Sequence, residues 1–179
     1  MRVLGIVGSP RGGGNTETLV DEVLAGAQEA GAKTERITLS ALRVEPCRAC
    51  DACRGMGKCV IDDDMRELIT RMESSEVWVL GTPVYWWGPT AQFKAFLDRW
   101  YAFDGKREFF HRRVVFVVPS GGGETYADHT AGMLKEIAGY LGMDHRDTIL
   151  AGGSGRPGSV RNRDELMARA RAAGHHAAS

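Results

Sequence analysis

A glycine-rich loop after a short apolar segment constrains this chain more than any other feature. Val3–Val7 is an apolar run of strand length, and residues 8–14, four of them glycine, lead from it into an amphipathic segment that begins near Thr16. Glycines let the backbone approach a ligand closely, and the first turn of a helix presents N–H groups and the positive end of the helix dipole. The pattern therefore predicts a strand, an anion-binding loop and a helix in succession, with a phosphate as the expected occupant.

The polar residues of this loop indicate which kind of phosphate ligand it could bind. Arg11 carries a permanent positive charge, and Ser9, Asn15 and Thr16 carry short hydrogen-bond donors. A Walker loop ends in Gly-Lys-Ser or Gly-Lys-Thr, but the first lysine of the chain is Lys33, and the Gly-x-Gly-x-x-Gly spacing of dinucleotide-binding loops is also absent. The loop holds no cysteine that could serve a phosphatase. The remaining candidate ligand is a terminal phosphate monoester, as on FMN. The alternative is that the loop is a strand–helix turn that binds nothing.

Length and charge exclude several classes of protein. The chain has 179 residues, enough for one domain over 1–179, and its Lys plus Arg and Asp plus Glu totals are both 23. A net charge of zero argues against nucleic acid as a partner and against an acidic surface that docks basic carriers. No apolar stretch approaches the roughly 20 residues of a membrane span, and the N-terminus enters a strand without a signal peptide, so we expect a cytoplasmic protein.

Apolar runs and amphipathic segments alternate along the whole chain. The predicted strands are Val3–Val7, Thr34–Thr38, Val77–Leu80, Val114–Val118 and Thr148–Ala151. The predicted helices are Thr16–Ala30, Asp64–Glu73, Thr90–Tyr101, Thr125–Leu141 and Asp164–Ala173, followed by a frayed tail. Alternating strands and helices indicate an α/β three-layer sandwich, in which helices cover both faces of a five-stranded parallel sheet.

Two further loops follow predicted strands, at the edge where open α/β sheets bind ligands. Residues 81–89 contain Tyr85, Trp86 and Trp87 in succession, which would suit a flat aromatic ring. The alternative is that these aromatics pack on the sheet or at a subunit contact. Ser120–Gly123 supplies glycines and N–H donors that let the backbone approach a ligand, the alternative being a flexible turn.

All four cysteines lie in one short segment, residues 47–59. Cys47, Cys50, Cys53 and Cys59 have the spacing C-x2-C-x2-C-x5-C, of which the first three match a ferredoxin-type run while the fourth departs from it. A four-cysteine zinc site normally pairs two C-x-x-C units across a longer spacer. An iron–sulfur cluster is therefore the favoured occupant, with zinc and free or redox-active thiols as alternatives.

The chain resembles the NADPH-dependent FMN reductase-like branch of the flavodoxin-like proteins and, more narrowly, the iron–sulfur flavoproteins. The matching pieces are the loop with Ser9 and Arg11, the cysteine segment, Asp62–Met65, Thr82–Trp86, Lys94 with Leu97–Arg99, and Ser120–Gly123. The resemblance implies the strand order 2-1-3-4-5 and a homodimer or homotetramer. The implied FMN-binding residues are Ser9, Arg11, Asn15, Thr16, Pro83, Val84, Tyr85, Trp86, Ser120, Gly121, Gly122 and Gly123. The implied ligands of a 4Fe-4S cluster are Cys47, Cys50, Cys53 and Cys59.

These features predict a redox enzyme. FMN would take electrons from NADH, NADPH or a reduced carrier and pass them to a small-molecule or protein acceptor, through the cluster where one is held. No side chain is predicted to be catalytic, because the flavin supplies the chemistry. The alternatives are a carrier without NAD(P)H turnover, an FMN or quinone reductase without a cluster, and a phosphate-binding module without redox function. On the third helix, Lys94, Asp98 and Arg99 are expected to form an ion-pair face or a subunit contact.

Overall fold

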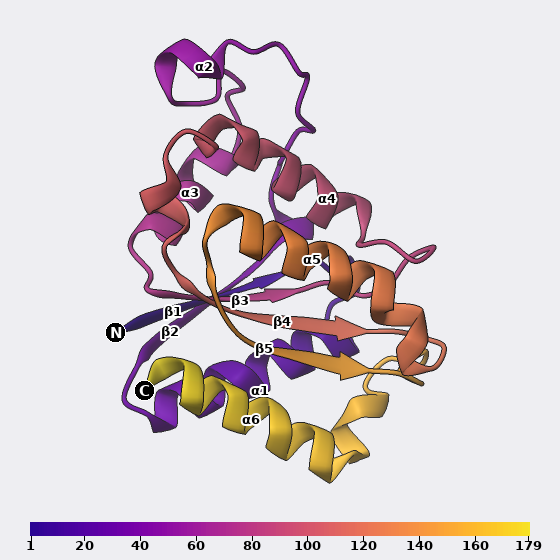
Figure 1. Ribbon diagram of the computed structural model, residues 1–179. Helices are drawn as coiled ribbons and strands as arrows, with labels where there is room; N and C mark the ends of the chain where they lie inside the picture. The colour runs from indigo at the N-terminus through magenta and orange to yellow at the C-terminus, as the bar shows by residue number, and fades with distance from the viewer.

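The computed structural model describes residues 1–54, 56–106 and 108–179. Its centre is one parallel sheet in the order β2-β1-β3-β4-β5 (Figure 1), which confirms the predicted order. The strands are β1 (Arg2–Val7), β2 (Lys33–Thr38), β3 (Val77–Gly81), β4 (Arg113–Pro119) and β5 (Asp144–Ala151). Within the described residues, no helix is long and apolar enough to cross a membrane.

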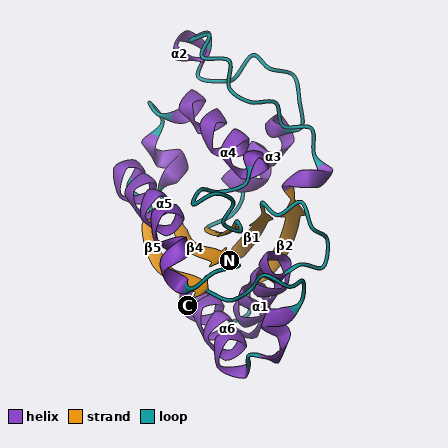
Figure 2. Ribbon diagram, turned by 90° about the vertical axis from the view of Figure 1, so that its right-hand side faces the viewer, coloured by secondary structure: helices purple, strands orange, loops and turns teal.

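Helices cover both faces of the sheet, as predicted (Figures 1 and 2). One layer consists of α1 (Asn15–Glu29) and α6 (Asp164–Ala178), and the opposite layer of α3 (Met65–Glu73), α4 (Ala91–Asp98) and α5 (Asp128–Leu141). The long connection between β2 and α3 carries the short helix α2 (Cys53–Met56) and lies over the layer of α3 and α4 (Figure 1).

The core divides into two clusters, one on each face of the sheet. Strand β3 is buried along its whole length and contributes to both clusters, because successive side chains point to opposite faces. Toward α1 and α6 the strands present mainly valines, including Val77 and Val79, whereas toward α3, α4 and α5 they present larger side chains such as Trp78 and Phe116. The aromatic cluster therefore lies beneath the layer that carries the cysteine segment.

The helix α6 is longer than predicted. A helix to Ala173 and a frayed tail were expected, but α6 runs to Ala178, and Gly174, Ala177 and Ala178 are buried. A Cβ atom on Gly174 would lie 1.8 Å from the carbonyl oxygen of Val23, and one on Gly26 the same distance from that of Arg171. These two glycines let the backbones of α1 and α6 touch, and the close packing orders the predicted tail.

Three other boundaries differ from the prediction. Strand β5 begins at Asp144 rather than Thr148, because its first residues are polar and partly exposed at the sheet edge and carry no apolar pattern. The predicted helix Thr90–Tyr101 is α4 followed by a 3-10 helix at Arg99–Phe103. Likewise, a 3-10 helix at Glu124–Ala127 precedes α5, where a continuous helix from Thr125 was predicted.

Candidate functional site

Four loops meet at the carboxyl edge of the sheet and line a cleft of about 190 Å³. They follow β1, β3, β4 and β5, so the topology alone brings them together. The lining residues are Ser9, Arg11, Gly14, Asn15, Thr16, Pro83, Val84, Tyr85, Pro119, Gly121, Ser154, Gly155 and Pro157. Eight of the twelve residues expected to bind the cofactor are among them: Ser9, Arg11, Asn15, Thr16, Pro83, Val84, Tyr85 and Gly121.

The loop after β1 presents the positive end of α1 to this cleft. Gly14 is the N-cap residue of α1, and the N–H of Thr18 makes the first bond of the helix, to the Gly14 carbonyl oxygen at 3.0 Å. The N–H groups of Asn15, Thr16 and Glu17 therefore have no backbone acceptor within the helix, whereas the Gly13 N–H in the loop donates to Glu17 Oε2 at 2.8 Å. Ser9 is buried, and its Oγ accepts a hydrogen bond from the Arg11 N–H at 3.2 Å, which shapes the turn. This geometry is that of an anion site.

Arg11 is the cation of the cleft. Its side chain is exposed, and it forms no ion pair with any residue that the structure describes. The neighbouring Arg36 differs, because Glu17 and Asp21 each lie 2.7 Å from it. Arg11 is thus available to a negatively charged ligand, whereas Arg36 is neutralised within the protein.

The side chain of Asn15, which lines the cleft, makes hydrogen bonds within the protein. Its Nδ2 donates to the carbonyl oxygens of Ser154 and Arg156, both at 2.8 Å, and its Oδ1 accepts from the Val160 N–H at 3.3 Å. Both Nδ2 hydrogens are therefore used within the protein. Asn15 anchors the loop after β5 to the loop after β1, so its side chain positions the cleft.

The loop after β5 was missed in the sequence analysis. Ser154, Gly155 and Pro157 line the cleft, and Ser154 is buried beneath it. A signal was present: Gly152-Gly153-Ser154-Gly155 directly follows an apolar run, in the same manner as the glycines after β4. The apolar run predicts the strand, but its pattern does not indicate that the loop behind it lines the cleft.

The three aromatic side chains of the loop after β3 lie in different surroundings. Tyr85 and Gly88 exchange backbone hydrogen bonds of 2.8 and 3.0 Å, and Trp86 and Trp87 between them have φ angles of 50° and 61°. Positive φ at both central residues marks a type I′ turn, which is strained for residues other than glycine and asparagine. Trp87 stacks on Tyr126 with ring centroids 5.9 Å apart. Tyr85 lines the cleft, whereas Trp86 is 92% exposed and lies outside the lining.

The loop after β4 contributes one lining residue and a rigid turn. Gly121 lines the cleft, while Ser120 is buried and its Oγ donates to the carbonyl oxygens of Gly122 and Gly123 at 3.3 and 3.0 Å. A Cβ on Gly122 would lie 2.7 Å from the ring of Tyr126. Ser120, Gly122 and Gly123 therefore shape the loop from outside the cleft lining.

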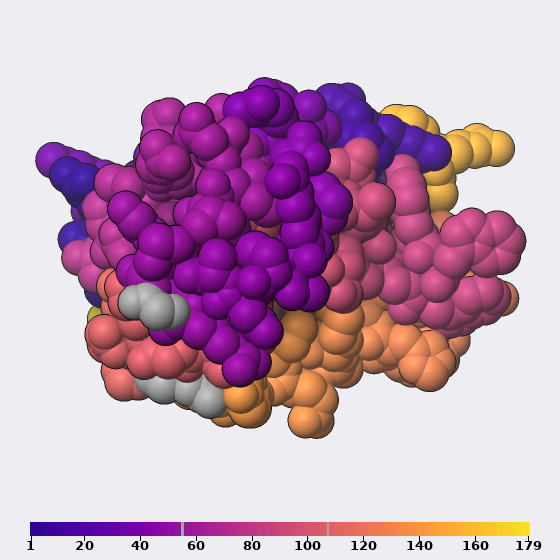
Figure 3. Space-filling model, turned by 90° about the horizontal axis from the view of Figure 1, so that it is seen from above, coloured from indigo at the N-terminus to yellow at the C-terminus, as the bar shows by residue number. Residues whose placement is uncertain are grey.

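The cysteine segment lies over the layer of α3 and α4 (Figure 1) and is exposed at the surface in the view from above (Figure 3). Cys47, Cys50, Cys53 and Cys59 all line one small pocket, which shares no lining residue with the cleft. Burial raises the pKa of the Cys53 thiol, and the three neighbouring thiols raise it further. Four thiols around one pocket are the donor set of an iron–sulfur or zinc site. Nevertheless, in the described part of the chain no three His, Cys, Asp or Glu side chains are arranged to hold a metal ion.

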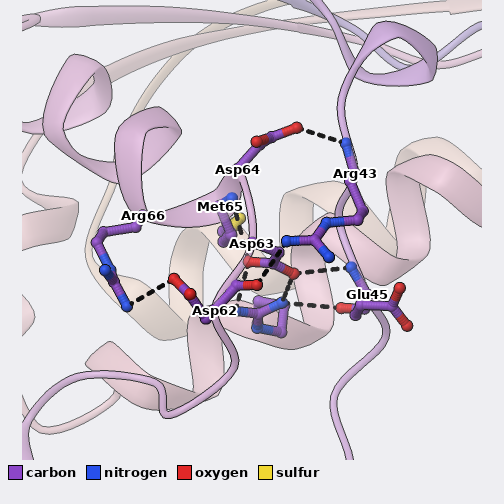
Figure 4. A network of polar contacts seen from close by, with 8 residues as sticks. Arg43, Glu45, Asp62, Asp63, Asp64, Met65 and Arg66 are labelled. Carbon is purple, nitrogen blue, oxygen red and sulfur yellow. Dashed lines mark hydrogen bonds and ion pairs between the residues drawn. The ribbon is translucent and has the colours of Figure 1, made fainter.

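A buried ion pair fixes the base of the cysteine segment. Arg99 Nη1 and Nη2 donate to the Asp63 carboxylate at 2.5 and 3.1 Å, and both side chains are at most 2% exposed. Asp63 also accepts the Glu45 N–H at 2.8 Å, and Arg99 donates to the Glu45 carbonyl oxygen at 2.9 Å. Figure 4 shows the carboxylates of Asp63 and Asp64 directed at the segment with Glu45 and Arg43, whereas the Asp62 carboxylate points to Arg66. The two ends of the segment are thereby joined.

This network departs from the expectation that Lys94, Asp98 and Arg99 form one ion-pair face. Lys94 and Asp98 form an exposed ion pair of 2.5 Å, but Arg99 is buried against Asp63 and takes no part in that face. Burial alone would raise the pKa of Asp63, but hydrogen bonds from Arg99 and the Glu45 N–H outweigh it and hold that pKa below its usual range. Burial lowers the pKa of Arg99, but Asp63 and the nearby Cys59 raise it to a greater extent.

A doubly covered parallel sheet of this order, with a phosphate-type cleft at its carboxyl edge, defines a flavodoxin-like protein. The sequence model of the family described as NADPH-dependent FMN reductase matches residues 1–154, and the chain belongs to that family. The solved structure of an NAD(P)H:quinone oxidoreductase from Methanothermobacter marburgensis superposes with a TM-score of 0.76 at 22% identity, over 98% of both chains. That likeness shows the fold.

Two curated relatives carry the name iron–sulfur flavoprotein. One, from Methanocaldococcus jannaschii, is 44% identical over 99 residues, which are 55% of this chain and 51% of that protein. The other, from Archaeoglobus fulgidus, is 34% identical over 141 residues, 79% of this chain and 60% of that protein. The matched part is thus only half to three fifths of the length of these relatives.

Proposed function

We propose that this protein is an FMN-dependent oxidoreductase that takes electrons from NADH or NADPH. The observation that carries the proposal is the free guanidinium of Arg11 beside the first turn of α1, at a cleft built from four loops. The phosphate of FMN would meet Ser9, Arg11, Thr16 and the first N–H groups of α1. Pro83, Val84, Tyr85 and Gly121 would face the rest of the cofactor. The family to which the chain belongs supports this assignment.

When bound, FMN supplies the redox chemistry between the nicotinamide and an acceptor. The residues of this chain bind and orient it. Asn15 holds the loops after β1 and β5 together, and the Trp86–Trp87 turn is braced by Tyr126 and by the Thr130 hydroxyl, which donates to the Trp87 carbonyl oxygen at 3.0 Å. Rigid walls of this kind lower the ordering cost of binding.

The cysteine segment is proposed to hold a 4Fe-4S cluster through Cys47, Cys50, Cys53 and Cys59. The shared pocket of the four thiols and the names of the relatives support this proposal. A reductase without a cluster, in which the cysteines stay thiols, is the alternative. The exposed aromatic side chains near the cleft, Tyr85, Trp86, Trp87 and Tyr126, support a homodimer or homotetramer that covers them.

The proposed FMN site is tested by comparing two ligands that differ only in the phosphate. We expect Arg11→Ala to weaken FMN binding by at least about tenfold, because a charge-assisted contact to phosphate contributes about 1.5–3 kcal/mol. The affinity for riboflavin, which lacks the phosphate, should not change. Fluorescence titration of the flavin-free protein gives both dissociation constants. Lys135→Ala, an exposed cation on α5 that lines no part of the cleft, is the control.

Stopped-flow mixing of the FMN-loaded protein with excess NADH or NADPH tests the activity itself. We expect the flavin absorbance to bleach with one of the two nucleotides. A flavin that binds tightly but is not reduced by either nucleotide within minutes would contradict the proposed enzyme and favour an electron carrier.

A further inference from the structure

A cavity larger than the proposed FMN cleft lies away from it. It has a volume of about 620 Å³ and opens between the cysteine segment, α3 and the chain after α4. It shares no lining residue with the cleft, and it adjoins the cysteine pocket through Cys59, Val60, Ile61 and Arg99, which line both. This volume is within the range of pockets that bind small organic molecules.

The walls of the cavity are mainly apolar. Met65 and Ile69 from α3 and Phe103 from the 3-10 helix after α4 are nearly fully buried, and each lines the cavity. Met56 and Val60 of the cysteine segment line the opposite side and are about half exposed. An exposed methionine and valine over an apolar floor form a surface that an apolar ligand body would cover favourably.

The mouth of the cavity is cationic. Lys58 and Lys106 both line the cavity and are exposed, and neither forms an ion pair with a residue that the structure describes. The Lys106 side chain lies against the cysteine segment, since a Cβ on Gly57 would be 3.0 Å from its Nζ. Arg66 adds a third charge, although Asp62 lies 3.1 Å from it. Glu73 is the acidic residue among the cavity's lining.

A buried hydrogen-bond donor also lines this cavity. Arg99 is 98% buried and lines the cavity, and its Nε lacks a hydrogen-bond partner among the described residues. The other two nitrogens of this guanidinium are bonded to Asp63 and Glu45. A buried N–H without an acceptor is destabilising, and an acceptor atom of a bound ligand would relieve it.

We propose that this cavity binds a small amphipathic organic anion, with the apolar body between α3 and the cysteine segment and the acidic group between Lys58 and Lys106. The apolar walls account for the body, and the two unpaired lysines account for the negative group, while the unsatisfied Arg99 donor lies in the buried wall that the cavity shares with the cysteine pocket. The site is separate from the FMN cleft and does not depend on the function proposed for it.

Titration of the FMN-saturated protein with 8-anilinonaphthalene-1-sulfonate tests this site. The probe combines an aromatic body with one sulfonate, and we expect saturable binding at one site per chain with a rise in its fluorescence. Lys106→Glu should lower the affinity for the probe by about tenfold, because it replaces an attractive charge with a repulsive one near the sulfonate. Lys135→Glu makes the same charge change on the exposed face of α5 and should leave the affinity unchanged.

A second variant tests the cavity by its size. Thr70 is exposed on α3 and lines the cavity, so Thr70→Trp should fold normally, as circular dichroism would verify, and should block the probe. N-phenyl-1-naphthylamine, a neutral probe of similar shape, should bind more weakly and should not respond to Lys106→Glu. Probe binding that does not saturate, that is equal in the two lysine variants, or that survives Thr70→Trp would overturn the proposal.

Discussion

Asp63 and Arg99 carry opposite charges at a depth where an unpaired charge is strongly destabilising. Nothing in the sequence around Asp62, Asp63 and Asp64 distinguishes the three carboxylates. In the structure Asp63 alone is buried, because its oxygens meet Arg99 and the N–H groups of Glu45 and Met65. Asp62 and Asp64 remain exposed. Which of three identical side chains becomes structural is decided by the partner that the fold brings to it.

Asp63→Asn should lower the free energy of unfolding by about 3–5 kcal/mol at pH 7, because it leaves the Arg99 charge buried and unpaired. Asp62→Asn is the matched control. Asp62 is 85% exposed in its ion pair with Arg66, so its loss should cost under about 1 kcal/mol. Urea unfolding followed by circular dichroism gives both values. Equal stabilities for the two variants would contradict the role assigned to Asp63.

The same ion pair makes the free energy of unfolding depend on pH. The pKa of Asp63 is lowered in the folded chain, so the unfolded chain takes up the proton first as the pH falls. The stability from this carboxylate is therefore present above the ordinary aspartate pKa of about 4 and is lost as the pH falls below it. The difference in unfolding free energy between wild type and Asp63→Asn should narrow over that range. A gap that stays constant from pH 7 to about 3 would show that the carboxylate is not the source.

At the scale of elements, the packing of α1 on α6 depends on backbone contact. We expect Gly26→Ala to destabilise the fold by about 1–3 kcal/mol, because its Cβ would overlap the Arg171 carbonyl oxygen unless the helices move apart. Gly139 lies in the helix α5 with open space around it, so Gly139→Ala should instead stabilise by up to about 1 kcal/mol through helix propensity. Urea midpoints measure both changes. A neutral Gly26→Ala would mean that α1 and α6 are not in contact there.

The sequence pattern predicts the ends of some strands and helices correctly and misses others. Strands β1, β3 and β4 are buried on both faces, so their continuous apolar runs were recognised. Strand β5 starts with exposed polar residues at a sheet edge, and its first half was missed. The end of α6 looks like a tail because Gly174 and the small alanines carry no apolar stripe, yet α1 provides the surface against which they pack.

At the scale of the whole molecule, the two proposed cofactor sites are separate units on one fold. The cleft and the cysteine pocket have no lining residue in common. We therefore expect Cys50→Ser to remove iron and sulfide from the protein while leaving its FMN affinity unchanged. Cys50 is exposed, so the serine should not disturb the core. Anaerobic purification, an absorption spectrum, and iron, sulfide and flavin assays on one sample provide the measurement.

The wild-type protein is the reference for that comparison. A broad absorbance beyond the flavin peaks, with iron and sulfide near four per chain, is expected for a four-thiolate cluster. A purely yellow wild-type protein without iron would contradict the cluster and leave a flavin reductase with free thiols. Loss of FMN together with iron in Cys50→Ser would instead show that the two sites depend on each other.

The sequence by itself determined the alternation of strands and helices and the loop at the N-terminus of α1, because local hydrophobic periodicity and glycine placement encode both. It also placed the four cysteines in one short segment, whereas the pocket that all four line is formed by the tertiary structure. Only the tertiary structure decided that Asn15 holds the loop after β5, that Ser154 and Gly155 line the cleft, and that Arg99 is buried against Asp63. Those outcomes join residues far apart in the chain. No local pattern records such a pairing, because it arises from the spatial order of the strands in the sheet.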